Sequence, residues 1–164
     1  MPPSSIDTTS LGPSDRSIVQ WALYEAVRWN NPPGIPPQQQ AIEHPEMRRY
    51  HDGWGREGDF GVRASIDGEF VGAAFGRLFS DDDHGHGYVD EDTPEIGISV
   101  VSAHRGSGVG TQLMNALADE ARKLGMGRLS LSVNNPNPAK RLYERLGYVE
   151  VDDDGDSTLM VLEL

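Results

Sequence analysis

The chain has 164 residues and a mass of 17.9 kDa, enough for one domain with a sizeable hydrophobic core. Its net charge of −12 argues against a nucleic-acid partner, and the lack of cysteine excludes disulfides, thiolate metal sites and a cysteine nucleophile. The sequence contains no apolar run of about 18 residues, so no membrane span is predicted, and the first residues lack the features of a signal peptide. We therefore expect a cytoplasmic protein made of a single domain over residues 1–164.

The amino-terminal part of the chain predicts helices. The first 14 or so residues are expected to form a flexible segment or an edge strand. Apolar residues at helical spacing predict a helix over 15–30, which the proline-rich segment 31–37 ends because proline cannot continue a helix. A weaker helix is predicted over 38–50, and a loop over 51–59.

The rest of the chain predicts a β-hairpin followed by alternating strands and helices. Strands over 60–66 and 70–79 are predicted to pair, because the Asp67-Gly68 sequence between them is typical of a tight hairpin turn. A long acidic loop, 80–94, follows. The later predicted elements are a strand over 95–101, a helix over 109–124, a strand over 128–133, a helix over 138–146, and strands over 148–151 and 158–162. This order indicates a mixed α/β sandwich.

Three glycines, Gly106, Gly108 and Gly110, lie on alternate positions between a predicted strand and a predicted helix. Bare backbone there admits a close ligand, and an anion is the usual one because the first helical turn has unpaired N–H groups and a positive dipole end. Two phosphate-binding motifs fail the spacing test. The chain has no Gly-Lys-Ser or Gly-Lys-Thr of a P-loop, and Thr111 or Leu113 stands where the dinucleotide fingerprint needs its last glycine. A tight turn without a ligand is the alternative.

Basic residues gather in the segment that holds these glycines. Residues 101–148 carry seven Lys and Arg against three Asp and Glu. That segment has a net charge of +4, which leaves −16 for the rest of a chain whose total is −12. We interpret it as a local basic surface for a polyanionic ligand; chance and helix solvation are the alternative.

A second motif follows about 30 residues after the first. The segment 129–148 reads LSLSVNNPNPAKRLYERLGY. Its Asn137, Ala139, Tyr143 and Gly147-Tyr148, together with the R-x-x-G-x-G pattern that begins at Arg105, resemble the GNAT superfamily of acetyl-CoA-dependent N-acetyltransferases. The resemblance covers roughly residues 60–150 and is specific because both motifs occur together.

The resemblance implies an α/β fold with a mixed, mostly antiparallel central sheet, a splayed strand pair and helices on both faces. In the family the strand before the glycine loop, here 95–101, carries a bulge and splays from the next strand, and the pantetheine arm of the coenzyme fills the gap. The pyrophosphate lies against backbone amides at the helix start, and one amide of Val100 or Val101 faces the acetyl oxygen. The implied coenzyme-binding residues are Val100, Val101, Arg105, Gly106, Ser107, Gly108, Val109, Gly110, Thr111, Asn137 and Lys140. Either Lys140 or Arg141 is expected to contact the phosphates of the coenzyme.

Two residues are the candidates for proton transfer. Tyr143 occupies the family's general-acid position, where a phenol donates to the departing thiolate; a core aromatic is the alternative. Glu95 is the candidate general base, because the acceptor amine must lose a proton before it attacks and burial would raise the pKa of the carboxyl. An ordinary edge carboxylate, with a water chain serving as the base, is the alternative.

The acidic loop invites two further interpretations. His84 and His86 suggest a metal site, but a solvated loop fits better and we expect no metal. The loop's carboxylates could attract a cationic acceptor or only keep the loop soluble. Among the tryptophans, Trp21 and Trp29 are expected to pack in the core, while Trp54 fits either core or site.

The sequence thus predicts an enzyme that transfers an acetyl group from acetyl-CoA to a primary amine by direct attack in a ternary complex. The main alternative is a non-catalytic acyl-CoA-binding module of the same fold. A nicotinamide-dependent oxidoreductase is disfavoured by the failed fingerprint. The expected partners are acetyl-CoA and an amine acceptor, a cationic small molecule or a peptide, with no nucleic acid and no membrane; the family resemblance leaves a homodimer open.

Overall fold

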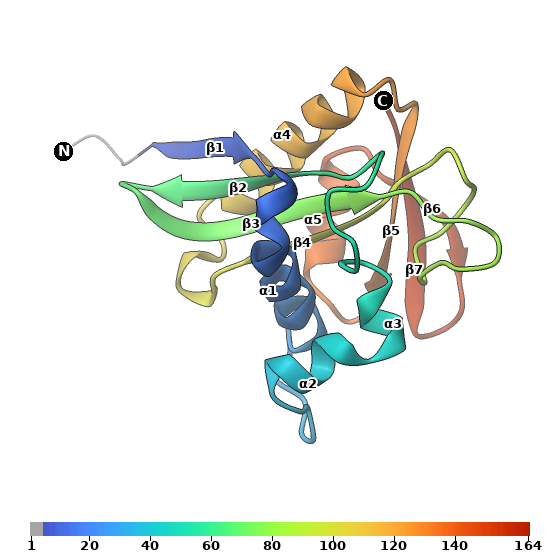
Figure 1. Ribbon diagram of the computed structural model, residues 1–164, viewed down its shortest axis with the longest axis horizontal. Coiled ribbons are helices and arrows are strands. Elements are labelled where there is room, and N and C mark those ends of the chain that lie inside the picture. Colours follow the sequence, from blue (N-terminus) through green and yellow to red (C-terminus); the bar gives the residue numbers. More distant parts are fainter. Residues whose placement is uncertain (1–4) are drawn as a thin grey trace.

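The computed structural model describes residues 5–164 (Figure 1). Within them seven strands form one sheet in the order β1-β2-β3-β4-β5-β7-β6. The strands are β1 (Ile6–Ser10), β2 (Phe60–Ile66), β3 (Glu69–Arg77), β4 (Glu95–Val100), β5 (Arg128–Asn134), β6 (Val149–Asp153) and β7 (Ser157–Glu163). All neighbours pair antiparallel except β4 and β5, which are parallel. The predicted mixed, mostly antiparallel sheet is confirmed, and β1 forms one edge of it.

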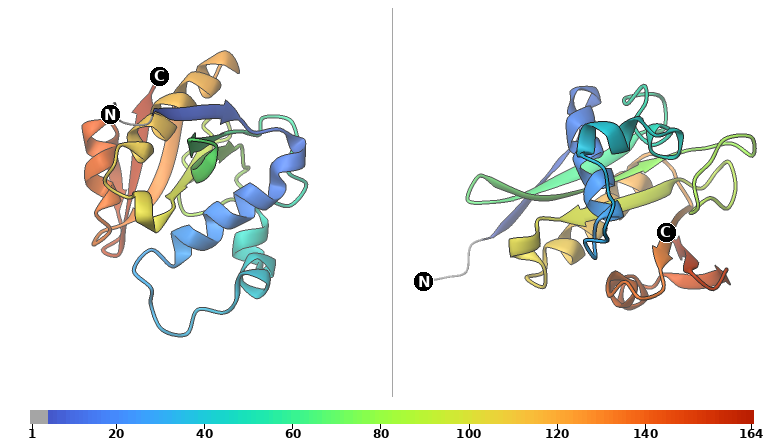
Figure 2. Two further views of the ribbon diagram at one scale, coloured as in Figure 1. Left: turned by 90° about the vertical axis from the view of Figure 1, so that its left-hand side faces the viewer. Right: turned by 90° about the horizontal axis from the view of Figure 1, so that it is seen from below.

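Helices cover both faces of this sheet. They are α1 (Arg16–Val27), α2 (Gln38–Glu43), α3 (Pro45–Arg48), α4 (Val109–Lys123) and α5 (Ala139–Arg145), with short 3₁₀ turns at Pro13–Asp15 and Ser102–His104. Helices α1, α2 and α3 lie on one face, and α4 and α5 on the other (Figure 2, right).

Two helix predictions need correction. The helix expected over 15–30 ends at Val27. The helix expected over 38–50 is broken at His44, whose backbone is extended with ψ 136°. Proline disfavours the helical conformation in the residue before it, so Pro45 forces this break and starts α3 in a new direction.

The β2–β3 hairpin forms as predicted. Asp67 and Gly68 have φ values of 51° and 80°, and the left-handed conformation at both positions is what a tight two-residue turn needs. β3 ends at Arg77, two residues before the predicted boundary at residue 79.

The larger core lies between the sheet and helices α4 and α5. The stripe Val109, Leu113, Leu117 and Ala121 on α4 is almost fully buried, as its helical spacing predicts. Burying each of the valine and leucine side chains in this stripe contributes about 1.5–3 kcal/mol to folding. A second cluster on the opposite face joins α1 to Trp54 and Phe75.

The sheet opens between β4 and β5. Their parallel pairing is limited to Glu95 opposite Ser130, and in Figure 1 β2 and β3 run across the view while β5 and β7 run down it. The predicted splayed pair is therefore confirmed. The bulge expected in 95–101 is not in the β3–β4 pairing, whose register is continuous from Gly72 opposite Val100 to Arg77 opposite Glu95. Within residues 5–164 no helix is long and apolar enough to cross a membrane.

Candidate active site

The glycine loop leads directly into α4. Gly106 and Gly108 have φ values of 77° and 91°, a left-handed conformation that side chains with a Cβ rarely adopt, and Gly108 is the residue before the first helical turn. Within the described chain, a Cβ built at either position has no atom within 4 Å. The amides of Val109, Gly110 and Thr111 have no acceptor inside the helix, as in every first helical turn. The loop thus presents unobstructed donors to an anion.

The backbone N–H groups along β4 point alternately toward β3 and toward β5. This corrects the expectation that Val101 holds the coenzyme. The Val101 N–H donates to the Val71 carbonyl oxygen at 2.9 Å, and the Val101 carbonyl accepts from the His104 N–H at 2.8 Å. Val101 therefore faces β3 and is not free to hold a ligand. Because N–H direction alternates along a strand, the amides of Val100 and Ile98 face the opening beside β5.

The carboxyl-terminal motif is only partly oriented as expected. The Asn137 side-chain oxygen accepts from the Ala139 N–H at 2.9 Å, so it caps the start of α5. The Lys140 ammonium donates to the Thr158 hydroxyl at 3.1 Å and lies 4.0 Å from a Glu150 oxygen. Lys140 is thus held against β6 and β7 rather than turned to the glycine loop, and Arg141 and Arg145 are exposed cations of this helix.

Glu95 is buried where the splayed strands meet. Its side chain lies on the α1–α3 face of the sheet. There, Oε1 accepts hydrogen bonds from the Tyr50 hydroxyl and, at 2.9 Å, from the Gly87 N–H. Within the described residues the other oxygen, Oε2, is buried without a partner. Burial raises the pKa of Glu95, against the opposing effect of these hydrogen bonds. A carboxylate so placed has an increased tendency to take up a proton.

Tyr50 was not among the sequence candidates. It lies 45 residues before its partner Glu95, in a segment without regular spacing, so no sequence pattern could have indicated the pair. Its ring packs edge-on against Phe75 and Phe79 at centroid distances of 6.4 and 5.3 Å. Burial and the neighbouring carboxylate raise the pKa of Tyr50, so the phenol keeps its proton.

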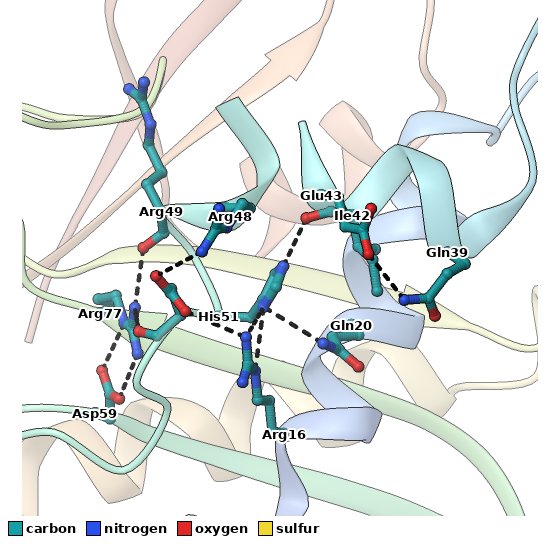
Figure 3. A network of polar contacts seen from close by, with 11 residues as sticks. Arg16, Gln20, Gln39, Ile42, Glu43, Arg48, Arg49, His51, Asp59 and Arg77 are labelled. Carbon is teal, nitrogen blue, oxygen red and sulfur yellow. Dashed lines mark hydrogen bonds and ion pairs between the residues drawn. The ribbon is translucent and has the colours of Figure 1, made fainter. Parts of the chain in front are cut away.

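A buried ion pair fixes the segment that carries Tyr50 (Figure 3). The Arg77 and Asp59 side chains are 0% and 3% exposed, and the ion pair is 2.8 Å long. The same guanidinium donates to the carbonyls of Arg49 and Asp52 at 2.9 and 2.8 Å, one on each side of Tyr50. Arg77 thereby holds the backbone before and after the tyrosine.

His51, the next residue after Tyr50, fastens the segment to α1 and α2 (Figure 3). Its Nε2 lies 2.8 Å from the Ile42 carbonyl and must therefore carry the proton, while Nδ1 accepts from Arg16 at 3.3 Å. Burial lowers the pKa of His51, so the ring is neutral. Two anchors thus position Tyr50.

The loop after β3 closes over Glu95 with glycines. A Cβ on Gly85 would collide with the Tyr50 hydroxyl, and one on Gly87 would lie 2.8 Å from Glu95 Cγ. His84 stacks on Tyr88 with ring centroids 4.2 Å apart. Among residues 5–164 no group of three His, Asp or Glu is placed to hold a metal ion. The two glycines of the His-Gly-His-Gly sequence therefore allow the loop backbone to lie directly against Tyr50 and Glu95.

Some carboxylates of this loop have partners inside the protein. Asp81 accepts from the Tyr88 hydroxyl at 2.6 Å, Asp83 lies 3.6 Å from Arg49, and Asp90 pairs with Arg128. These carboxylates therefore stabilise the conformation of the loop in addition to giving it negative charge.

Trp54 and Trp21 pack against other aromatic rings, whereas Trp29 is half-buried and belongs to none of the hydrophobic clusters found in the described residues. Trp54 is buried, and its indole N–H donates to the Gly12 carbonyl at 3.0 Å. Trp21 packs edge-on against Phe70 at a centroid distance of 4.9 Å. Trp54 thus belongs to the core.

Tyr143 lies on the opposite face of the sheet from the Glu95 side chain. Its ring belongs to the larger core, 5.8 Å from the Tyr148 ring centroid. Burial raises the pKa of Tyr143, so its phenol stays protonated at neutral pH. This environment fits a proton donor and a core aromatic alike.

An opened parallel strand pair, with a glycine loop at one end and a buried carboxylate at the other, defines the class of acyl-CoA-dependent acyltransferases. The sequence profile described as the acetyltransferase (GNAT) family matches residues 22–148. The chain therefore belongs to this family and is an acetyltransferase.

Individual relatives agree with this assignment. Streptothricin acetyltransferase from Streptomyces lavendulae is 48% identical over 52 residues, a match that spans 31% of this chain and 28% of that protein. PaiA N-acetyltransferase from Thermoplasma acidophilum, solved with coenzyme A, is 15% identical with a TM-score of 0.66, covering 98% of this chain and 99% of that one. YncA from Salmonella typhimurium, solved with acetyl-CoA, is 21% identical with a TM-score of 0.69, covering 98% and 95%. At these identities the two structures show a shared fold.

Proposed function

We propose that this acetyltransferase moves an acetyl group from acetyl-CoA to a primary amine by direct attack in a ternary complex. The observation that carries the proposal is the single parallel contact between Glu95 and Ser130, beyond which β4 and β5 diverge toward the glycine loop. PaiA and YncA, which share the fold, were solved with coenzyme A and acetyl-CoA. The chain has no cysteine to form an acyl-enzyme, which favours direct transfer.

The coenzyme would lie along β4. Its pyrophosphate would accept hydrogen bonds from the amides of residues 107–111, with Arg105 and Arg141 as nearby cations. The pantetheine arm would run beside the free amides of Val100 and Ile98. Five residue steps separate Val100 from Glu95, or about 17 Å of strand, so the arm would bring the thioester toward the buried carboxylate.

The two proton-transfer candidates lie on opposite faces of the sheet, and each would act in a different proton transfer of the reaction. The ammonium of the acceptor must lose a proton, and Glu95, whose pKa is raised by burial, would receive it. The amine would then attack the thioester carbon, and the amide of Ile98 or Val100 would stabilise the oxyanion. Tyr143, which keeps its proton, would donate to the sulfur as the thiolate leaves.

The acceptor is proposed to be cationic. Beside the cavity next to Glu95 the charged side chains include Glu46, Arg49 and Asp83, which pairs with Arg49, and His86 also acts electrostatically on Glu95. The carboxylates outnumber the guanidinium there, which favours a protonated amine. Acidic residues at 81–83 and 90–92 add further negative charge to the loop next to this region.

One experiment tests the proposal in two steps. Calorimetry should show acetyl-CoA binding to the purified protein. A panel of primary amines and peptide amino termini should then release free thiol from acetyl-CoA, with cationic acceptors fastest. Failure to bind acetyl-CoA, or no thiol release with any amine, would contradict the proposed function.

A further inference from the structure

A small cavity lies next to Glu95 but does not reach it. It has a volume of about 170 Å³ and is lined by Glu46, Arg49, Tyr50, His84, Gly85 and His86. Glu95 is behind this wall, only 4% exposed. A molecule in the cavity would therefore meet Tyr50 and not the carboxylate.

Tyr50 connects the cavity to the carboxylate. Its ring lines the cavity, and its hydroxyl donates to Glu95 Oε1. Gly85 and Gly87 bring the loop backbone against this hydrogen bond so closely that a side chain on either would collide with it. Direct access to Glu95 from this side is closed. The His86 backbone N–H approaches one lone pair of the phenol oxygen, and a hydroxyl oxygen has a second lone pair that can accept a further hydrogen bond.

We propose that the acceptor amine binds in this cavity and that Tyr50 relays its proton to Glu95. The ammonium N–H bond breaks as its proton moves to the Tyr50 oxygen, and the Tyr50 O–H bond breaks as its proton moves to Glu95 Oε1. The amine gains its lone pair, Tyr50 ends as it began, and Glu95 ends protonated. The inference rests on the proposed acetyl transfer and adds a catalytic residue to it.

The size of the cavity also restricts the acceptor. Sites for drug-sized ligands measure about 300–1,000 Å³, so 170 Å³ accommodates only one end of such a molecule. The acceptor class that fits is a slender aminoalkyl group, either a small linear amine or the end of a lysine-like side chain. A bulky secondary amine would not reach Tyr50.

Tyr50→Phe is the direct test, because it keeps the ring against Phe75 and Phe79 and removes the hydroxyl. Tyr24→Phe is the matched control: it also removes a buried hydroxyl, whose hydrogen bond goes to the Pro36 carbonyl. With a linear diamine such as 1,5-diaminopentane, we expect Tyr50→Phe to lower kcat/KM about a hundredfold at pH 7. Its acetyl-CoA affinity and melting temperature should match those of Tyr24→Phe, which should keep wild-type activity.

Two readouts separate a relay from a structural role. The loss should shrink as pH rises toward the pKa of the amine, and it should nearly vanish with 2,2,2-trifluoroethylamine, which is unprotonated at pH 7. The solvent-isotope proton inventory should change from two protons in wild type to one in the variant. Wild-type activity in Tyr50→Phe, or an equal loss with both amines, would overturn the relay. A wild-type protein that acetylates no amine would instead contradict the proposed function.

Discussion

A Cβ atom on Gly110 would lie 3.0 Å from Cδ2 of Leu142, so the helix that follows the glycine loop packs directly against the helix that carries Tyr143. Gly110 therefore has two roles, an open amide and a close helix contact. A substitution there would disturb α5 together with any coenzyme. Gly108 is the cleaner probe of the loop, because a Cβ at that position meets no atom of the described chain within 4 Å.

Gly108→Ala should weaken acetyl-CoA binding at least tenfold, or about 1.4 kcal/mol, because its Cβ and the altered backbone obstruct the loop amides. Gly125→Ala is the matched control. Gly125 has a similar φ of 79° and equally open surroundings, but it lies at the far end of α4. Calorimetry and thermal melting should show similar destabilisation in both variants and lost affinity only at Gly108. Equal affinities would contradict the pyrophosphate site.

Local signals in the sequence were sufficient for the glycine loop and α4, because spacing and turn chemistry act between near neighbours, whereas the splayed strand pair was expected only from the resemblance to the family. The alternation of a strand could also have excluded Val101 once Val100 was chosen, since adjacent amides face opposite sides. The direction of Lys140 depends on Thr158, and the closure of Glu95 depends on Tyr50. Such contacts arise between distant segments, and one sequence carries no pattern for them.

Tyr143→Phe tests the general acid. The substitution retains the ring in the core and deletes the proton donor, so kcat should fall roughly a hundredfold while acetyl-CoA affinity and melting temperature hold. Steady-state kinetics with a fast acceptor and calorimetry are the measurements. Unchanged turnover would identify Tyr143 as a core aromatic only.

Arg77→Met should cost about 3–5 kcal/mol of unfolding free energy, because it leaves Asp59 charged and unpaired in the interior. Arg122→Met is the control, since Arg122 pairs with Asp119 at the exposed surface and such pairs contribute about 0–1 kcal/mol. Urea denaturation measures both. The milder Arg77→Lys should also lower kcat/KM, because the carbonyls on either side of Tyr50 lose their shared donor. Similar costs for Arg77→Met and Arg122→Met would show that the buried pair does not hold this segment.

Glu95→Gln should change how stability depends on pH. The folded protein raises the pKa of Glu95 above its ordinary 4.5, mainly by burial. The folded state then binds more protons than the unfolded state, so this group destabilises the fold as pH rises from about 4.5 through the folded-state pKa. Relative to wild type, the variant should gain about 1.4 kcal/mol for each unit by which the pKa is raised, while losing activity. Urea denaturation from pH 4 to 8 checks this, and a difference that is constant across the range would contradict it.

The acidic loop offers a test of acceptor steering. Asp81 and Asp83 have partners inside the protein. The better set to neutralise is therefore three exposed carboxylates of the same loop, Asp82, Glu91 and Asp92. Their charges raise the local concentration of a cationic acceptor, and salt screens the effect over about 8 Å at physiological ionic strength. Changing all three to the corresponding amides should lower kcat/KM for a diamine by about tenfold at low salt and flatten its dependence on salt.

The matched control neutralises three exposed carboxylates on other strands or strand ends, Asp7, Glu69 and Glu163. It changes the net charge by the same amount, so an effect of total charge would appear in both variants and an effect of position only in the first. Because steering acts on encounter, kcat at saturating acceptor should stay the same in both. If the loop variant keeps the wild-type salt dependence, or if the fastest acceptor is anionic, the carboxylates of this loop serve its folding and solubility and do not guide the substrate.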